Sequence, residues 1–142
     1  MWSKAPVCLD TSVAIYAFTS VDERAAIANI VLGRADFISV QLLNEFANAT
    51  LRKQGRSWAE VRGALNRIRR AVPRILSLDD AIHTEGLRIA ERYRLSIYDA
   101  MMLAAALSGG ARTFYSEDMQ HGMMIDETLR VVDPFIPGAL DQ

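Results

Sequence analysis

The sequence predicts a three-layer α/β/α domain around a central parallel sheet of about five short strands. Short, almost wholly apolar segments alternate along the chain with longer helical patterns. Strands buried on both faces are typical of parallel sheets that helices cover from both sides. The 142 residues suit a single domain spanning 1–142, and no linker, internal repeat or low-complexity stretch divides them.

The elements of the first half follow in order. The segment "PVCLD" reads as a buried strand that ends in a polar turn, Asp10-Thr11-Ser12. A helix is expected over "DERAAIANIVLG", with its apolar stripe at Ala26, Ile27, Ile30 and Val31. The β-branched and aromatic content of 36–40, "DFISV", predicts a second strand. A helix over "LLNEFANATLRKQG" follows.

The second half continues the alternation. Ser57 and Glu60 have the spacing of a capping box, which predicts a helix start there. Residues 74–78, "RILSL", form the third predicted strand, and Asp79 is expected to cap the helix after it. The apolar segment "DAMMLAAALSGG" predicts a buried helix that begins near Asp99. The segments "ARTFYS" and "LRVVDPF" supply the last two strands.

Composition restricts the class of protein. A hydrophobic share of 51% against 23% charged residues provides a core and argues against disorder. Cys8 is the lone cysteine, so no internal disulfide is expected and a reducing compartment is favoured. The start of the sequence lacks a signal-peptide pattern, and no apolar run is long enough to cross a membrane. We therefore expect a cytoplasmic protein without a membrane partner.

Four acidic residues stand at equivalent places in this pattern. Asp10 ends the first strand, Glu45 lies early in the helix after the second strand, Asp99 opens the buried helix, and Asp118 follows the strand "TFY". Sites in such sheets form beyond the carboxyl ends of the strands, which is where these residues are expected to gather. Three of them also have an ordinary explanation: Asp10 as a strand-end turn or helix cap, Asp99 as a helix cap, and Glu45 as a common helical glutamate.

Several carboxylates beside a core repel one another unless protons, basic side chains or a metal ion compensate them. Oxygen ligands suit Mg²⁺ or Mn²⁺, whereas the motifs of zinc sites are missing from the sequence. Setting these four aside from the 17 acids leaves the 16 Lys and Arg in excess. An acidic metal site on a mildly basic body is suited to phosphodiester hydrolysis, in which the metal lowers the pKa of an attacking water.

Basic residues are concentrated between Arg52 and Arg74, where Glu60 is the one acid. This strip is either a solvated helix face or a surface that meets a phosphate backbone. In the second interpretation, Arg52, Lys53 and Arg56 are the candidate RNA-binding residues.

At these residues the sequence resembles the PIN-domain family, and in particular the VapC-type toxins of toxin–antitoxin pairs. The resemblance covers essentially the whole chain. It rests on four segments in order: "CLDTSVAIYAF", "SVQLLNEFANAT", "LSIYDAMMLAAAL" and "TFYSEDMQHG", the last followed by "LRVVDPF". It implies a Mg²⁺-dependent ribonuclease, with Mn²⁺ as a substitute, that forms a homodimer and is held inactive by a cognate VapB-type antitoxin.

Carried over by position, the resemblance makes Asp10, Glu45, Asp99 and Asp118 the metal-binding and catalytic acids. Supporting roles fall to Thr11 or Ser12, whose hydroxyl would orient Asp10 or a water, and to Ser116. Glu117 is an immediate rival to Asp118 for the last position.

Two alternatives stay open. A PIN scaffold without activity could bind RNA or a protein partner. An aspartate-based phosphotransfer domain also sets acids at strand ends, but Ser12 stands where a phosphatase of that kind needs a second aspartate, and no lysine follows Lys53.

Overall fold

The computed structural model describes residues 5–141. Its main sheet has the strand order β1-β4-β6-β5. Three of these strands run parallel: β1 (Val7–Leu9), β4 (Thr113–Tyr115) and β6 (Leu129–Val132). The short strand β5 (Met124–Ile125) pairs antiparallel with β6. The α/β class and the mostly parallel sheet confirm the predicted architecture.

Two further strands, β2 (Ile38–Ser39) and β3 (Ile75–Leu76), pair parallel with each other. Asp36, just before β2, joins this pair to the main sheet. Its backbone N–H donates to the carbonyl of Val7 at 2.9 Å, and its carboxylate accepts the Val7 N–H at 2.7 Å. Together, β1, β2, β3, β4 and β6 are the five predicted strands, whereas β5 is a two-residue addition that the sequence did not predict.

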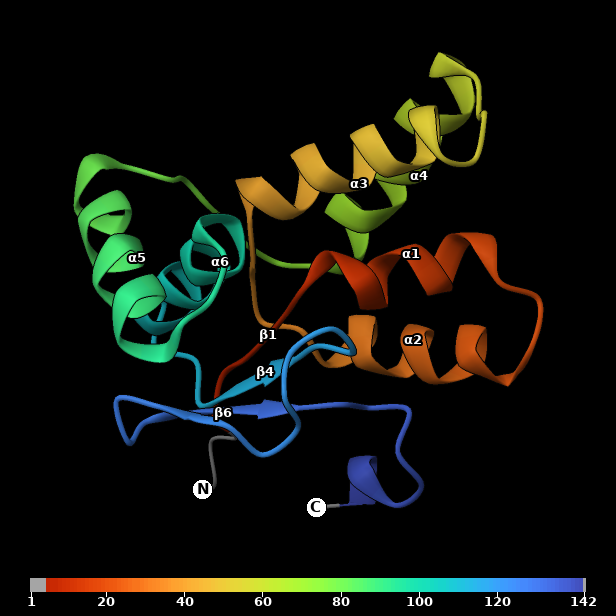
Figure 1. Cartoon of the computed structure of the whole chain (residues 1–142). Helices are drawn as coiled ribbons and strands as arrows, with labels where there is room; N and C mark the ends of the chain where they lie inside the picture. Colours follow the sequence, from red (N-terminus) through yellow and green to blue (C-terminus); the bar gives the residue numbers. More distant parts are fainter. Residues whose placement is uncertain (1–4, 142) are drawn as a thin grey trace.

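Six α-helices occur within residues 5–141, and they pack as three successive pairs (Figure 1). The pairs are α1 (Thr11–Thr19) with α2 (Glu23–Arg34), α3 (Val40–Arg52) with α4 (Trp58–Ala71), and α5 (Asp80–Tyr93) with α6 (Ile97–Ser108). The pair α3–α4 lies furthest from β4 and β6 in this view. A 3₁₀ turn, Ala139–Asp141, follows the sheet.

Each helix begins at a polar residue whose side chain accepts a backbone N–H from the first turn, which satisfies one of the orphan donors there. These N-caps are Asp10, Asp22, Ser39, Ser57, Asp79 and Ser96. The capping box of Ser57 and Glu60 and the cap at Asp79 are confirmed.

Three details differ from the predictions. Helix α1 follows β1 directly, where we expected only a polar turn. The buried face of α2 is Ala28, Val31 and Leu32, so the predicted stripe is wrong at Ala26 and Ile30, which are exposed. Ser96, rather than Asp99, caps α6, because its hydroxyl accepts the Asp99 N–H at 3.1 Å.

Helix α6 forms the centre of the core. Its residues from Ala100 to Ala106 are all buried, in keeping with its predicted burial. Among the described residues, none of the helices combines the length and the apolar character needed to span a bilayer.

Candidate active site

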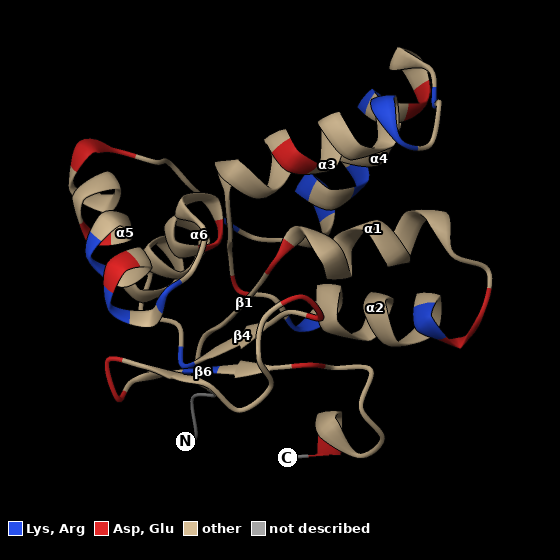
Figure 2. Cartoon of the chain, viewed as in Figure 1, with Lys and Arg blue, Asp and Glu red and all other residues tan. Residues whose placement is uncertain are grey.

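The acidic residues lie where the parallel strands end. Figure 2 shows acidic segments at the end of β1, on the first half of α3, at the start of α6 and in the loop after β4, while basic segments gather on α4 and on its connection to α3. The strand ends of a parallel sheet share one edge, so residues far apart in sequence meet there.

Asp10 is the most constrained of the four acids. Its side chain is buried, at 5% exposure. One carboxylate oxygen accepts the backbone N–H of Ser12 at 2.8 Å and so caps α1. The other accepts the hydroxyl of Ser116, which is fully buried, at 2.5 Å. The ordinary role of Asp10 as a helix cap is therefore real, but it uses only one of the two oxygens.

Burial raises the pKa of Asp10 to about 6, because a buried carboxylate loses its hydration. The hydrogen bonds from Ser116 and Ser12 favour the ionised form and lower the pKa, whereas the negative charges of Asp118 and Asp99 raise it. Three acids are therefore close enough to repel one another, and Asp10 has no basic partner among the described side chains within salt-bridge distance.

Glu45 is tied to the end of β1 by hydrogen bonds. The hydroxyl of Thr11 donates to one of its oxygens at 3.0 Å, and the side-chain amide of Gln41 donates to the other at 2.9 Å. Glu45 and Asp99 then line one open recess with a volume of about 440 Å³. Gln41 was not predicted as a site residue, although its spacing of four residues from Glu45 on one helix puts the two side chains on one face.

Asp118 and Glu117 have different surroundings. The Glu117 carboxylate accepts the hydroxyl of Tyr16 at 2.8 Å and forms an ion pair with Arg24. Asp118 has no such partner among the described residues, and partial burial raises its pKa, as do the charges of Glu117 and Asp99, while Lys53 lowers it. Glu117 thus has an ionic partner of its own in Arg24, whereas Asp118 is the acid of this loop without a salt bridge among the described residues.

The hydroxyl groups near Asp10 divide their roles. Ser116 orients Asp10 and also accepts the backbone N–H groups of Asp118 and Met119, each at 3.2 Å. The hydroxyl of Thr11 binds Glu45, and that of Ser12 accepts the Glu117 N–H at 3.3 Å. Ser116 is therefore the hydroxyl that holds Asp10, and the other two organise its neighbours.

The donor set suits a hard divalent cation, because it consists of carboxylate and hydroxyl oxygens. Within residues 5–141, however, no group of three or more His, Cys, Asp or Glu side chains is arranged to enclose an ion. Mg²⁺ is commonly bound through one or two carboxylates and retains several waters, whereas a structural zinc site needs a closed set of ligands. The residues fit a partly hydrated ion and do not fit a structural zinc ion.

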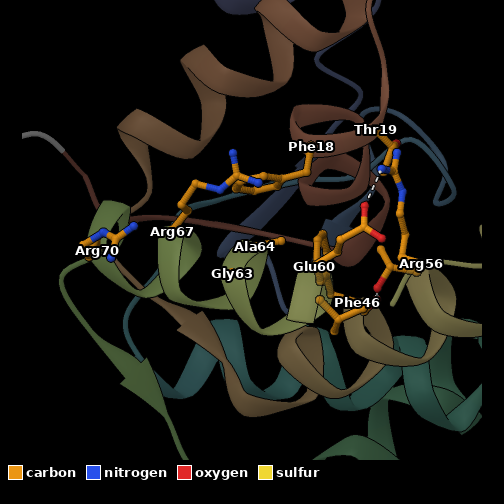
Figure 3. A pocket seen from close by; sticks show the side chains of 11 residues that line it. Phe18, Thr19, Phe46, Arg56, Glu60, Gly63, Ala64, Arg67 and Arg70 are labelled. Carbon is orange, nitrogen blue, oxygen red and sulfur yellow. Dashed lines mark hydrogen bonds and ion pairs between the residues drawn. The ribbon is translucent and has the colours of Figure 1, made fainter. Parts of the chain in front are cut away.

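The basic segment flanks a second cavity of about 400 Å³ between α1, α3 and α4, whose lining includes Phe18 and Phe46 (Figure 3). Arg56, Arg67 and Arg70 stand around it. The guanidinium of Arg67 lies over the Phe18 ring, 4.7 Å from its centre. Of the three predicted RNA-binding residues, only Arg56 lines this cavity, and it also pairs with Glu60 at 3.3 Å.

A family model described as "PIN domain" matches residues 7–121, which is most of the chain and includes all four acids. No curated protein sequence gives a match.

Several solved structures share the fold. VapC20 of Mycobacterium tuberculosis, a toxin that cleaves the sarcin–ricin loop, is 18% identical with a TM-score of 0.64, over 79% of this chain and 91% of its own. A toxin–antitoxin complex from Klebsiella pneumoniae is 20% identical with a TM-score of 0.68, over 91% of this chain and 98% of its own. The DNA-bound VapBC complex of Salmonella typhimurium is 20% identical with a TM-score of 0.66, over 92% of this chain and 99% of its own. At these identities the likeness establishes the fold.

Proposed function

The chain belongs to the PIN domain family, and on that premise we propose that it is a divalent-metal-dependent endoribonuclease of the VapC type. One observation carries the proposal. Asp10 is a buried carboxylate whose pKa is raised to about 6, and the charges of Asp99 and Asp118 act on it. Capping of α1 uses only one of the two Asp10 oxygens, and a cation bound in the working state would relieve both the lost hydration and the repulsion.

The chain's own residues prepare this site. Ser116 and the Ser12 N–H hold the Asp10 carboxylate in one orientation. Thr11 and Gln41 do the same for Glu45. A bound Mg²⁺ or Mn²⁺ would lower the pKa of an attacking water and polarise the phosphodiester. Asp10, Asp99 and Asp118, whose charges act on one another, would hold the ion directly or through its waters, together with Glu45, which shares a recess with Asp99.

RNA is the substrate that the charge distribution supports. Acids gather at the sheet edge, and Arg52, Lys53 and Arg56 are exposed at the far end of α3 and beyond it. Basic side chains there would hold the phosphate backbone on either side of the cleavage point, and this binding would weaken with salt.

Regulation by an antitoxin is the second part of the proposal. The structures that share the fold include toxin–antitoxin complexes and a toxin that cleaves the sarcin–ricin loop. We propose that a VapB-type antitoxin inhibits this chain and that the active form is a homodimer. Coexpression with the product of an adjacent small gene should yield a complex without ribonuclease activity, and light scattering should give the mass of a dimer for the free chain.

Mutation of the acids tests the activity. Asp10→Asn and Asp99→Asn should each abolish Mn²⁺-dependent cleavage of total RNA while the folded state persists. Asp79→Asn is the matched control, because Asp79 is also an acidic helix N-cap, lies on another helix, and asparagine caps as well as aspartate. Full cleavage by both site variants would refute the proposal.

A metal titration separates the nuclease from a PIN scaffold without activity. Saturable Mn²⁺ binding that requires Asp10 supports the nuclease. RNA binding without saturable Mn²⁺ binding supports the scaffold instead.

A further inference from the structure

The recess beside Glu45 and Asp99 has a lining that metal binding does not explain. It is lined by Gln41, Asn44, Glu45, Asn48, Tyr98 and Asp99. Its volume of about 440 Å³ falls in the range of small-molecule sites. Apart from the two acids, the lining consists of three side-chain amides and one aromatic ring.

The amides form one stripe along α3. Gln41, Asn44 and Asn48 are separated by three and four residues, the spacing that places helical side chains side by side. Gln41 is committed to Glu45. The side chains of Asn44 and Asn48 are exposed and make no hydrogen bond to other residues in the described part of the chain. They present donors and acceptors to the recess that the fold itself leaves unused.

Tyr98 forms the opposite wall, from the first turn of α6. Its side chain is 67% exposed, although it directly precedes Asp99. A large ring held in water beside a candidate catalytic acid gains nothing for stability, because burial of its apolar face would be favourable. The exposed ring offers the recess a flat face on which a planar partner can stack.

We propose that this recess binds one nucleobase of the RNA, which stacks on Tyr98 while Asn44 and Asn48 hydrogen-bond to its edge. Single-stranded RNA is recognised in this way, by aromatic stacking and hydrogen bonds to splayed bases. The inference rests on the proposed ribonuclease activity and adds to it a site for base preference next to the cleavage point.

The lining argues for a base over a phosphate. No lysine or arginine is among its described residues, so a phosphate could be held there only through the metal ion, whereas the free amides match the donors and acceptors of a base edge. The basic residues stand one turn or more further along α3, where Arg52 continues the stripe four residues after Asn48. The helix would thus present acidic, amide and basic side chains, in that order, to successive parts of one RNA strand.

The test measures binding without cleavage. The full chain in EDTA is titrated with short labelled single-stranded oligonucleotides of adenosine, cytidine or uridine, and fluorescence anisotropy gives the affinity. Tyr98→Ala should lower the affinity roughly 5- to 150-fold, the range for one lost base stack, and Tyr98→Phe should retain it. Asn44→Ala and Asn48→Ala should change the ratio of affinities between bases by about 2- to 10-fold.

Ile97→Ala is the matched control. Ile97 is a neighbouring side chain on α6 with 51% exposure, and it does not line the recess. Wild-type affinity of Tyr98→Ala, an equal loss in Tyr98→Ala and Ile97→Ala, or a loss in Tyr98→Phe as large as in Tyr98→Ala would each overturn the proposal. A loss that occurs only when light scattering also detects dissociation into monomers would assign Tyr98 to a contact between two copies of the chain and overturn it as well.

This design keeps the two proposals separate. RNA binding that depends on Tyr98, without metal-dependent cleavage, would leave the base site standing and refute the nuclease. Cleavage that depends on Asp10 but is indifferent to Tyr98, in rate and in sequence preference, would refute the base site alone.

Discussion

Replacing Asp10 by asparagine should stabilise the metal-free protein at neutral and alkaline pH. Burial raises the pKa of this carboxyl from 3.8 to about 6. Each unit of difference between the folded and unfolded pKa corresponds to about 1.4 kcal/mol, so ionised Asp10 costs the folded state roughly 3 kcal/mol. Asparagine can keep the bond from the Ser12 N–H. Its amide then faces the Ser116 hydroxyl, which already accepts two backbone N–H groups, so the lost hydrogen bond makes this figure an upper limit for the gain.

The sign of the pH dependence follows from the direction of the shift. Because the folded pKa is the higher one, the folded state binds more protons than the unfolded state between about pH 4 and pH 6. The free energy of unfolding of the wild type therefore falls as the pH rises through this window, and the full cost applies above it. Asp10→Asn removes this cost, so the variant should gain up to about 3 kcal/mol at about pH 8 and little at about pH 4.

Urea unfolding in EDTA at the two pH values measures the difference. In thermal unfolding, the gain at the higher pH corresponds to an increase in Tm of about 10 °C for a chain of this size. Saturating Mn²⁺ should stabilise the wild type and leave Asp10→Asn unchanged, because only the ionised carboxylate gains from the cation. A variant no more stable than the wild type at about pH 8, or a gain of equal size at both pH values, would refute the reasoning.

Five other substitutions test the surroundings of the site and the packing of the helices. Ser116→Ala removes a buried hydroxyl that donates to the buried aspartate, so it should cost about 1–3 kcal/mol in urea and move the acidic limb of the pH–rate profile to higher pH. Glu117→Gln should retain most RNA cleavage, since Arg24 already compensates that charge. Asp118→Asn should lower the initial rate of RNA cleavage at least about tenfold. Equal losses in the two variants would contradict this. Gly109→Ala would push a methyl group into buried side chains and should cost about 1–3 kcal/mol, whereas Gly63→Ala, with open space around it, should stabilise α4 by about 0.5–1 kcal/mol in the same urea assay.

The order of strands and helices could be predicted because burial on both faces leaves a strong pattern in the sequence. Each of the five predicted strands is present. Helix α1 was missed because its sequence, "TSVAIYAFT", is apolar on most sides and carries no helical periodicity to distinguish it from a strand. Strand β5 pairs through only two residues, too few for any period to be read.

The acids of the candidate site could be predicted from the sequence to lie at one edge of the sheet. Their hydrogen-bond and ionic partners could not be predicted. Glu117 and Asp118 are adjacent carboxylates in one loop. Only the fold brings Arg24, 93 residues away, to Glu117. The same holds for the bond between Thr11 and Glu45. Contacts between distant segments depend on the three-dimensional packing of helices, which a single sequence does not encode in any local pattern.

Helix α3 sets the geometry of the whole functional surface. Glu45 and Asn48 occupy the same face, and Arg52 lies seven residues after Glu45, about 10 Å along the axis at 1.5 Å per residue. A rigid helix keeps the proposed cleavage point, the proposed base recess and the basic end at fixed separations, whereas a loop would let them vary. The opposite face of the same helix, with Leu42, Leu43, Phe46 and Thr50, is buried, so the core that stabilises the fold also holds the three groups of side chains at fixed positions. A substitution in that buried face should therefore change both stability and cleavage preference, while one on the exposed face should change cleavage preference alone.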